Sequence, residues 1–79
     1  MRGADLQGAD LHEANLAESD LSEANLSQSI LVDCNLGAVD LTNANLTGAN
    51  LIGTNATDHR LMRARSLAGT IFPDGTTHE

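Results

Sequence analysis

The chain has 79 residues, with 11 acidic and 4 basic side chains and a formal net charge of −7 at pH 7. This charge disfavours nucleic-acid binding, which depends on Lys and Arg to neutralise phosphates. The length allows one domain near the lower limit for a self-sufficient core, and neither a run of membrane-spanning length nor a secretion signal is present.

Leucine returns at every fifth residue from Leu6 to Leu51. A step of five turns a side chain by about 140° on an α-helix and moves it to the opposite face of a strand, so neither element collects these leucines. A chain that turns a corner at each unit points them all at one axis, and its stacked turns pair their backbone groups as in a solenoid. The predicted core consists of Leu6, Leu11, Leu16, Leu21, Leu26, Leu31, Leu36, Leu41, Leu46 and Leu51.

Most of these leucines follow a small residue and then Asp or Asn. Ala4-Asp5-Leu6 and Ala44-Asn45-Leu46 are examples, whereas Ser29-Ile30-Leu31 lacks the polar residue. The unit resembles the A-[DN]-L-x-x motif of the pentapeptide-repeat family. The resemblance implies an all-β fold, a right-handed quadrilateral parallel β-helix with about twenty residues in each of about three and a half coils. The spacing alone fits a coil of any multiple of five residues.

The first repeat unit follows Met1-Arg2-Gly3 with no capping element. An uncovered coil exposes unpaired backbone groups, which is the hazard of an open sheet edge. Another copy could stack there, a preceding part of a longer chain could cover it, or the coil could fray. One expected partner is therefore a second copy, in a homodimer through this uncapped amino-terminal coil.

In a twenty-residue coil, residues twenty apart form columns with a spacing of about 4.8 Å. One predicted column is an asparagine ladder of Asn15, Asn35 and Asn55, and another stacks Arg60 over Asp20 and Asp40. The second residue after leucine also points outward and supplies Glu13, Glu18, Glu23 and Asp33. Glu13 and Asp33 share a face and the other two lie on the next faces. These carboxylates are either an acidic band for a basic partner or a solvated surface, which we favour.

Two residues invite a chemical interpretation. Cys34 stands where other units have Ala, so it is either a redox or metal thiol or a small buried residue, and we favour the second. A single cysteine excludes an internal disulfide. His12 lies beside Glu13 in an outward position and is interpreted as a surface imidazole.

The repeat weakens after Leu51, and two registers are open. Keeping the phase turns Leu61, Ser66 and Ile71 inward. One inserted residue between Thr57 and Leu67 turns Leu67 and Phe72 inward instead, and we prefer this slip because it buries two large apolar groups. Phe72 would then cover the open end of the core. We expect one domain, 1–79, with regular repeats over 4–56, a degenerate last coil over 57–72 and a turn and tail over 73–79.

Arg60, Arg63 and Arg65 hold most of the positive charge. They form either a site for an anion or a partner, or salt bridges to the acidic columns one coil below. We favour the salt bridges. Pro73-Asp74-Gly75 is a turn signal. The segment 70–78 resembles the closing segment of cyanobacterial pentapeptide-repeat proteins. The chain as written is expected to be soluble and cytoplasmic, or in the thylakoid lumen if a targeting segment has been removed.

No phosphate-binding glycine loop, metal-spaced Cys/His set or nucleophile with a base is present in the sequence. We therefore expect no enzyme activity, cofactor or metal, and predict a structural or protein–protein interaction module that binds neither nucleic acid nor membranes. The alternative is an acidic, DNA-mimicking regulator of a type II topoisomerase, which the short length and leucine core disfavour. The candidate partner surface consists of Glu13, Glu18, Glu23, Asp33, Arg60, Arg63 and Arg65.

Overall fold

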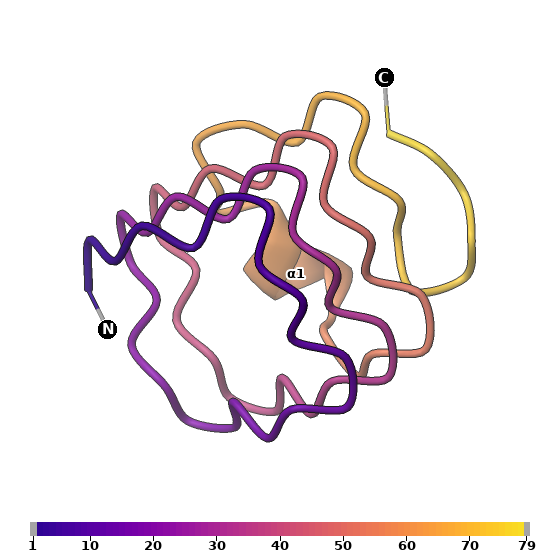
Figure 1. Cartoon of the computed structure of the whole chain (residues 1–79), viewed down its shortest axis with the longest axis horizontal. Coiled ribbons are helices and arrows are strands. Elements are labelled where there is room, and N and C mark those ends of the chain that lie inside the picture. The colour runs from indigo at the N-terminus through magenta and orange to yellow at the C-terminus, as the bar shows by residue number, and fades with distance from the viewer. Residues whose placement is uncertain (1, 79) are drawn as a thin grey trace.

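In the computed structural model the chain winds into a stack of coils (Figure 1). The structure describes residues 2–78, so Met1 and Glu79 of the expected domain lie outside the described residues. Parallel β-bridges join residues twenty apart, and they fall in four columns that begin at Asp5, Asp10, Asn15 and Asp20. Each regular coil therefore contains twenty residues and has four sides, which settles the period that the leucine spacing left open.

The β-structure is sparser than the expected all-β class. Within residues 2–78 the parallel pairing consists of isolated bridges, and the one named element is a helix, α1 (Asp58–Leu61). The reason is geometric, because the chain turns again after two or three extended residues. A turn follows every leucine, as in the hydrogen bonds from Ala9 N to Leu6 O (3.0 Å) and from Ala14 N to Leu11 O (2.9 Å).

Each regular corner places one residue in the left-handed region. It is the second residue after leucine, with φ of 63° at Glu13, 61° at Asp33 and 78° at Gly53. A positive φ at the third position of a hydrogen-bonded four-residue turn is the signature of a type II turn, which favours glycine or asparagine. Side chains at these corners point away from the core and are exposed.

The Asp or Asn before each leucine stabilises the next turn. Its Oδ1 accepts a hydrogen bond from the backbone N–H two residues later, from Ala17 to Asn15 (3.1 Å) for example, and from Thr47 to Asn45 (3.1 Å). Where a hydroxyl follows the leucine, as in Thr47, it donates to the same oxygen (2.7 Å). This Asx turn is the structural role of the polar residue in the motif. Ile30 has no acceptor for the N–H of Val32.

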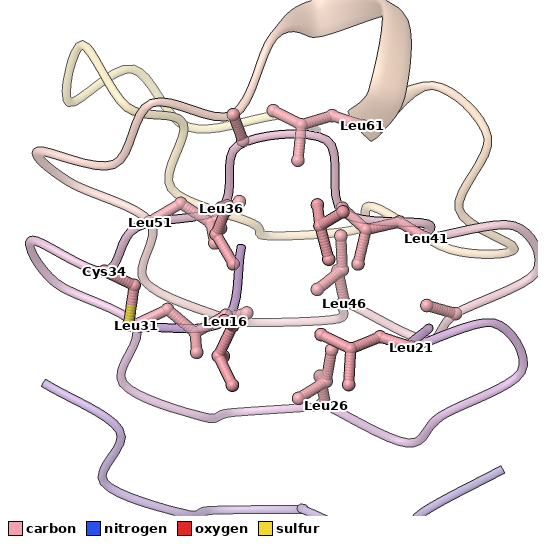
Figure 2. Close-up of a cluster of buried hydrophobic side chains, with 14 of the residues drawn as sticks. Leu16, Leu21, Leu26, Leu31, Cys34, Leu36, Leu41, Leu46, Leu51 and Leu61 are labelled. Atoms are coloured by element: carbon pink, nitrogen blue, oxygen red, sulfur yellow. The ribbon is translucent and has the colours of Figure 1, made fainter. Parts of the chain in front are cut away.

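The leucines from Leu16 to Leu51 are buried and form stacked layers inside the coils (Figure 2). Leu6 and Leu11 are only half-buried, although they pack against the same cluster. These two belong to the first coil, which has a coil on one side only in the described chain. The predicted core is thus enclosed from Leu16 onward, with Leu16 and Leu21 already buried within the first coil.

α1 closes the other end of the core. Thr57 caps the helix by accepting from Arg60 N, and Leu61 at the end of the helix is fully buried. In Figure 1 the helix lies across the interior of the coils, and Figure 2 shows Leu61 above Leu41 and Leu21. The expectation that Phe72 covers this end needs correction, because Phe72 is half-buried beside the core and stacks on His78 with 5.5 Å between ring centroids.

The register of the last coil slips by one residue. Asn45 pairs with Ser66 and Asn50 with Ile71, a spacing of twenty-one. Leu67 is buried, so the preferred slip is confirmed. Leu61 nevertheless keeps the old phase, which places the insertion between Leu61 and Leu67, where the chain leaves α1.

The tail folds back on the last coil. Gly75 N donates to Phe72 O (2.8 Å), which closes a turn over Pro73-Asp74, and Ile71 then forms an antiparallel bridge with Thr77. The last described backbone bond runs from His78 N to Thr70 O (2.8 Å). The tail therefore pairs with one edge of the last coil, as the turn signal predicts.

Candidate interaction surfaces

One corner of the stack gathers acidic groups. Glu13 N donates to Val32 O and Asp33 N to Ile52 O, which places Glu13, Asp33 and Gly53 in one column. His12 Nδ1 lies 3.8 Å from Glu13 Oε1. Ligand atoms of His12, Glu13 and Asp33 lie within 4.8 Å of one another, and all three side chains are exposed. This acidic corner presents negative charge to solvent on a fixed backbone.

The other two glutamates do not join this corner. Glu18 N donates to Gly37 O, so Glu18 lies on the next corner of the coil, and Glu23 N donates to Thr42 O on the corner after that. Glu23 instead meets Arg2, whose Nε lies 3.5 Å from Glu23 Oε1. The structure therefore brings Glu13 and Asp33 together but separates them from Glu18 and Glu23.

The arginines do not form the expected salt bridges to the acidic columns. In the described chain no ion pair involves Arg60, Arg63 or Arg65, so that interpretation is wrong for these positions. Arg60 Nη1 donates to the backbone oxygen of Val39 (2.9 Å). In the regular coils this oxygen accepts a backbone N–H from a residue twenty-one later, as Ser19 O does from Asp40 N (3.0 Å).

The guanidinium of Arg60 thus replaces its own amide, which bonds within α1 to Thr57 O (3.1 Å). Asn55 makes a comparable substitution, because its side chain accepts from Leu36 N and donates to Asn35 Oδ1 (2.9 Å). The predicted asparagine ladder is present at this step. Arg60 is therefore assigned a structural role, and Arg63 and Arg65 remain exposed.

One side of the stack differs from the other three in its chemistry. We name it the isoleucine face, and it consists of Ile30, Val32, Ile52, Ile71 and Pro73. Ile30 and Ile52 are 42% and 41% exposed, and with Met62 they are the exposed large hydrophobic residues of the described chain. The equivalent outward positions on the other sides hold mainly Asp, Asn, Ser, Thr, Gly and Ala. The sequence signal for this face is Ile30, which stands where the motif has Asp or Asn.

Reactive groups do not converge in the described chain. Cys34 is buried, its Sγ donates to Leu11 O (2.8 Å), and burial raises the pKa of its thiol, which disfavours the thiolate needed for nucleophilic or redox chemistry. This is the small buried residue that the repeat position predicts. Among residues 2–78 the acidic corner is the one group of three or more metal-ligand side chains.

Two shallow hollows accompany α1. Val39, Asp40, His59, Arg60 and Arg63 line one of them. The other lies between the start of α1 and the tail, and its lining is Ala56, Thr57, Asp58, Phe72, Pro73, Asp74 and Thr76. In the second hollow the Thr76 hydroxyl donates to Asp74 Oδ1 (2.6 Å), but both side chains are exposed, and the hydrogen bonds from the Thr76 hydroxyl and N–H hold the pKa of Asp74 below its usual value, which makes this carboxylate a weaker base. The hollows are therefore treated as contact surface.

The family of this chain follows from its repeats. The model of pentapeptide repeats matches residues 1–32 and 29–65, with 8 copies. The chain belongs to the pentapeptide-repeat family. Membership of this family fits a structural or interaction module. No curated protein matches the sequence.

Two solved pentapeptide-repeat structures are similar to this chain. One is a pentapeptide-repeat protein from the thylakoid lumen of Arabidopsis thaliana, at 31% identity and a TM-score of 0.70, over 90% of this chain and 46% of that one. The other is HetL, a protein involved in heterocyst differentiation regulation in the cyanobacterium Nostoc, at 37% identity and a TM-score of 0.42, over 96% of this chain and 33% of HetL. This pentapeptide-repeat chain spans less than half the length of either. The first neighbour implies a right-handed quadrilateral β-helix.

These findings do not support the topoisomerase alternative. The longest extent of the pentapeptide-repeat stack is 26 Å, shorter than one DNA turn of about 34 Å. The arginine-bearing α1 end also breaks the run of acidic columns that a DNA mimic would need. No helix among the described residues is long and apolar enough to cross a membrane.

Acid should destabilise the stack through its Asx turns. Hydrogen bonds from the Thr42 N–H and hydroxyl hold the pKa of Asp40 below its usual value, and those from the Ser22 hydroxyl and N–H do the same for Asp20. A lowered folded-state pKa adds stability above the unfolded pKa of about 3.9, and this stability is lost as the pH falls through the folded value. At pH values below about 4 the urea concentration at the unfolding midpoint should therefore decrease as the pH falls. The decrease should be less steep in Asp20→Asn/Asp40→Asn, because asparagine keeps both acceptor oxygens. Equal acid losses in the two proteins would contradict this role.

Proposed function

We propose that this protein is a non-enzymatic structural module that acts by protein–protein contact. We also propose that its coils form a right-handed quadrilateral β-helix, the fold that its structural neighbour implies. The proposal rests on one observation: apolar, acidic and basic side chains occupy different parts of a stack whose coils are joined by hydrogen bonds. The leucines from Leu16 onward are buried, Glu13 and Asp33 share one corner with His12, and Arg60, Arg63 and Arg65 lie in or just after α1. Because coil-to-coil hydrogen bonds already hold the backbone, a partner that docks on a side immobilises little of this chain, which favours binding.

The proposal predicts that one side of the stack contacts a specific protein in the cell. A photo-crosslinking residue is placed on each side in turn, at Gln7, Ile52, Ala17 or Thr42, and the full-length protein is expressed in the organism that encodes it. A module of this kind gives a discrete cross-linked product from one side and little from the others. Absence of a discrete product from all four sides would contradict a contact function.

We also propose that a second copy of this chain is a partner, in a homodimer through the first coil. The half-buried Leu6 and Leu11 of the first coil lie below Leu26 and Leu31, which are fully covered. Stacking two first coils would bury the exposed parts of these leucines and pair the free edge of the coil.

Light scattering across a concentration series is expected to show a dimer at high concentration. Leu6→Gln/Leu11→Gln should shift the protein to the monomer while far-UV circular dichroism shows that the coils remain folded. A folded wild-type monomer at every concentration would contradict the dimer, and would leave contact with a different protein as the role of the module.

A further inference from the structure

We propose that the isoleucine face binds a basic, aliphatic segment of a partner protein, in which Ile, Val or Leu side chains are accompanied by Lys or Arg. This inference rests on the proposed contact function and deepens it by assigning the side of the stack and the chemistry of the partner.

Ile30 and Ile52 are the exposed aliphatic side chains of the face, and Val32, Ile71 and Pro73 are half-buried. The β-bridges place Ile30, Asn50 and Ile71 in one column. The backbone oxygens of Val32, Ile52 and Pro73 accept from the neighbouring corner, and these three residues form a second column. Adjacent members of a column lie about 4.8 Å apart, so Val32, Ile52 and Pro73 follow one another in the second column, while Asn50 separates Ile30 from Ile71 in the first. Burying such groups against a partner is favourable, at about 25 cal/mol for each Å² removed from water.

Ile30 forfeits a stabilising contact of the fold. Its neighbours in the same column, Asp10 and Asn50, each accept a backbone hydrogen bond two residues later, from His12 N and Ile52 N (both 3.1 Å). An isoleucine cannot accept the equivalent bond from Val32. At this position an exposed apolar side chain therefore stands in place of an Asx turn.

The charges around the face are acidic. Asp10 lies directly below Ile30 in the first column, and the acidic corner of Glu13 and Asp33 borders the second column. Asp74 follows Pro73 at the other end. Two copies of the face would bring these carboxylates together, whereas a basic segment would pair with them.

Arg2, Arg60 and Arg63 lie on or beside the opposite side of the four-sided stack, whereas Arg65 lies on the side next to the isoleucine face, where its N–H donates to Ala44 O (2.7 Å). Arg60 contacts Val39 above the Asp20–Asp40 column, two sides away from the isoleucine face, and Asn43 N donates to Arg63 O on the corner beside that column. Arg2 pairs with Glu23 in the same region. No Lys or Arg belongs to the isoleucine face itself among the described residues, so the carboxylates around it favour a cationic partner.

The test is an NMR titration of the full ¹⁵N-labelled chain with two synthetic peptides. The first alternates Lys with Ile or Leu between Gly-Ser ends, and the second has Glu in place of Lys. We expect the cationic peptide to shift the amide signals of residues 10–13, 30–33, 50–53 and 71–74, with weaker binding at higher salt. The anionic peptide should bind much more weakly.

A matched pair of variants separates binding from stability. Ile30→Asn/Ile52→Thr introduces the residue types that the other sides use, so its urea midpoint should equal or exceed that of the wild type. Its affinity for the cationic peptide should be lower by about tenfold or more. Met62→Gln removes another exposed apolar side chain, 58% exposed beside α1, and should leave the affinity unchanged. Glu13→Gln/Asp33→Asn should weaken the cationic peptide and reduce its salt dependence.

The inference would be overturned by equal binding of both peptides, by signal shifts outside the face, or by unchanged affinity in Ile30→Asn/Ile52→Thr. Failure to bind the cationic peptide would overturn it as well, and so would self-association through the face, seen as concentration-dependent shifts of its signals without peptide. The cross-linking scan keeps the two proposals apart. A discrete product from Gln7, Ala17 or Thr42 in place of Ile52 would overturn the isoleucine face and leave the contact function standing.

Discussion

Leu26→Ala is expected to lower the free energy of unfolding by about 2–5 kcal/mol. Leu26 is fully buried in the second coil, between Leu6 in the coil below and Leu46 in the coil above. Its removal opens a cavity that the hydrogen-bonded coils cannot close, because their spacing is fixed. Domains of this kind have a total stability of about 5–15 kcal/mol, so the loss should be visible as a large fall in the urea midpoint.

Leu6→Ala is the matched control, since it lies in the same column but is half-buried in the first coil. Its expected loss is clearly smaller. Equal losses at Leu6 and Leu26 would mean that the first coil is covered in solution, which is the result expected for the stacked dimer at high protein concentration. The comparison is therefore made at a concentration where light scattering shows the monomer.

Leu61→Asp should be at least as damaging, because it places an unpaired charge at the closed end of the core. Leu61 is fully buried, and a buried charge without a partner costs about 3–5 kcal/mol. α1 has four residues and no stability of its own, so it depends on Leu61 for its position. We expect loss of α1 and the last coil, measured as lost amide protection over residues 58–72 and a lower urea midpoint.

The neighbouring substitution Met62→Asp provides the comparison. Met62 is 58% exposed, so the same new charge remains in water and should change the stability little. If Leu61→Asp were as stable as Met62→Asp, α1 would not act as a cap, and closure of this end would have to come from the tail.

The core was predictable because leucine at every fifth residue leaves few other solutions. The coil length was not, since the spacing is the same for several coil sizes, and it came from the family resemblance before the bridges Asp5↔Asn25 and Asp20↔Asp40 fixed it. The register slip was predictable from the positions of Leu67 and Phe72. The helix was missed, because a four-residue element carries too little periodicity to detect, although Thr57-Asp58 is a capping signal in retrospect.

The candidate surfaces were less predictable than the core. Spacing placed Glu13 and Asp33 in one column, but it treated the arginines as salt-bridging residues. Arg60 instead compensates for the amide that α1 removes from the coil, and such a substitution depends on the local path of the backbone. The isoleucine face also escaped prediction. Ile30 was recognised as a break in the motif, but its grouping with Ile52 and Ile71 depends on the four-sided register and the slip.

The cross-linking scan over the four sides of the stack in the native cell shows whether this chain contacts a protein and through which side. We expect one discrete protein adduct, from the residue placed at Ile52, and little from Gln7, Ala17 or Thr42. An adduct from a different side would move the contact surface away from the isoleucine face. No discrete adduct from any side would contradict the claim that this chain works by protein contact.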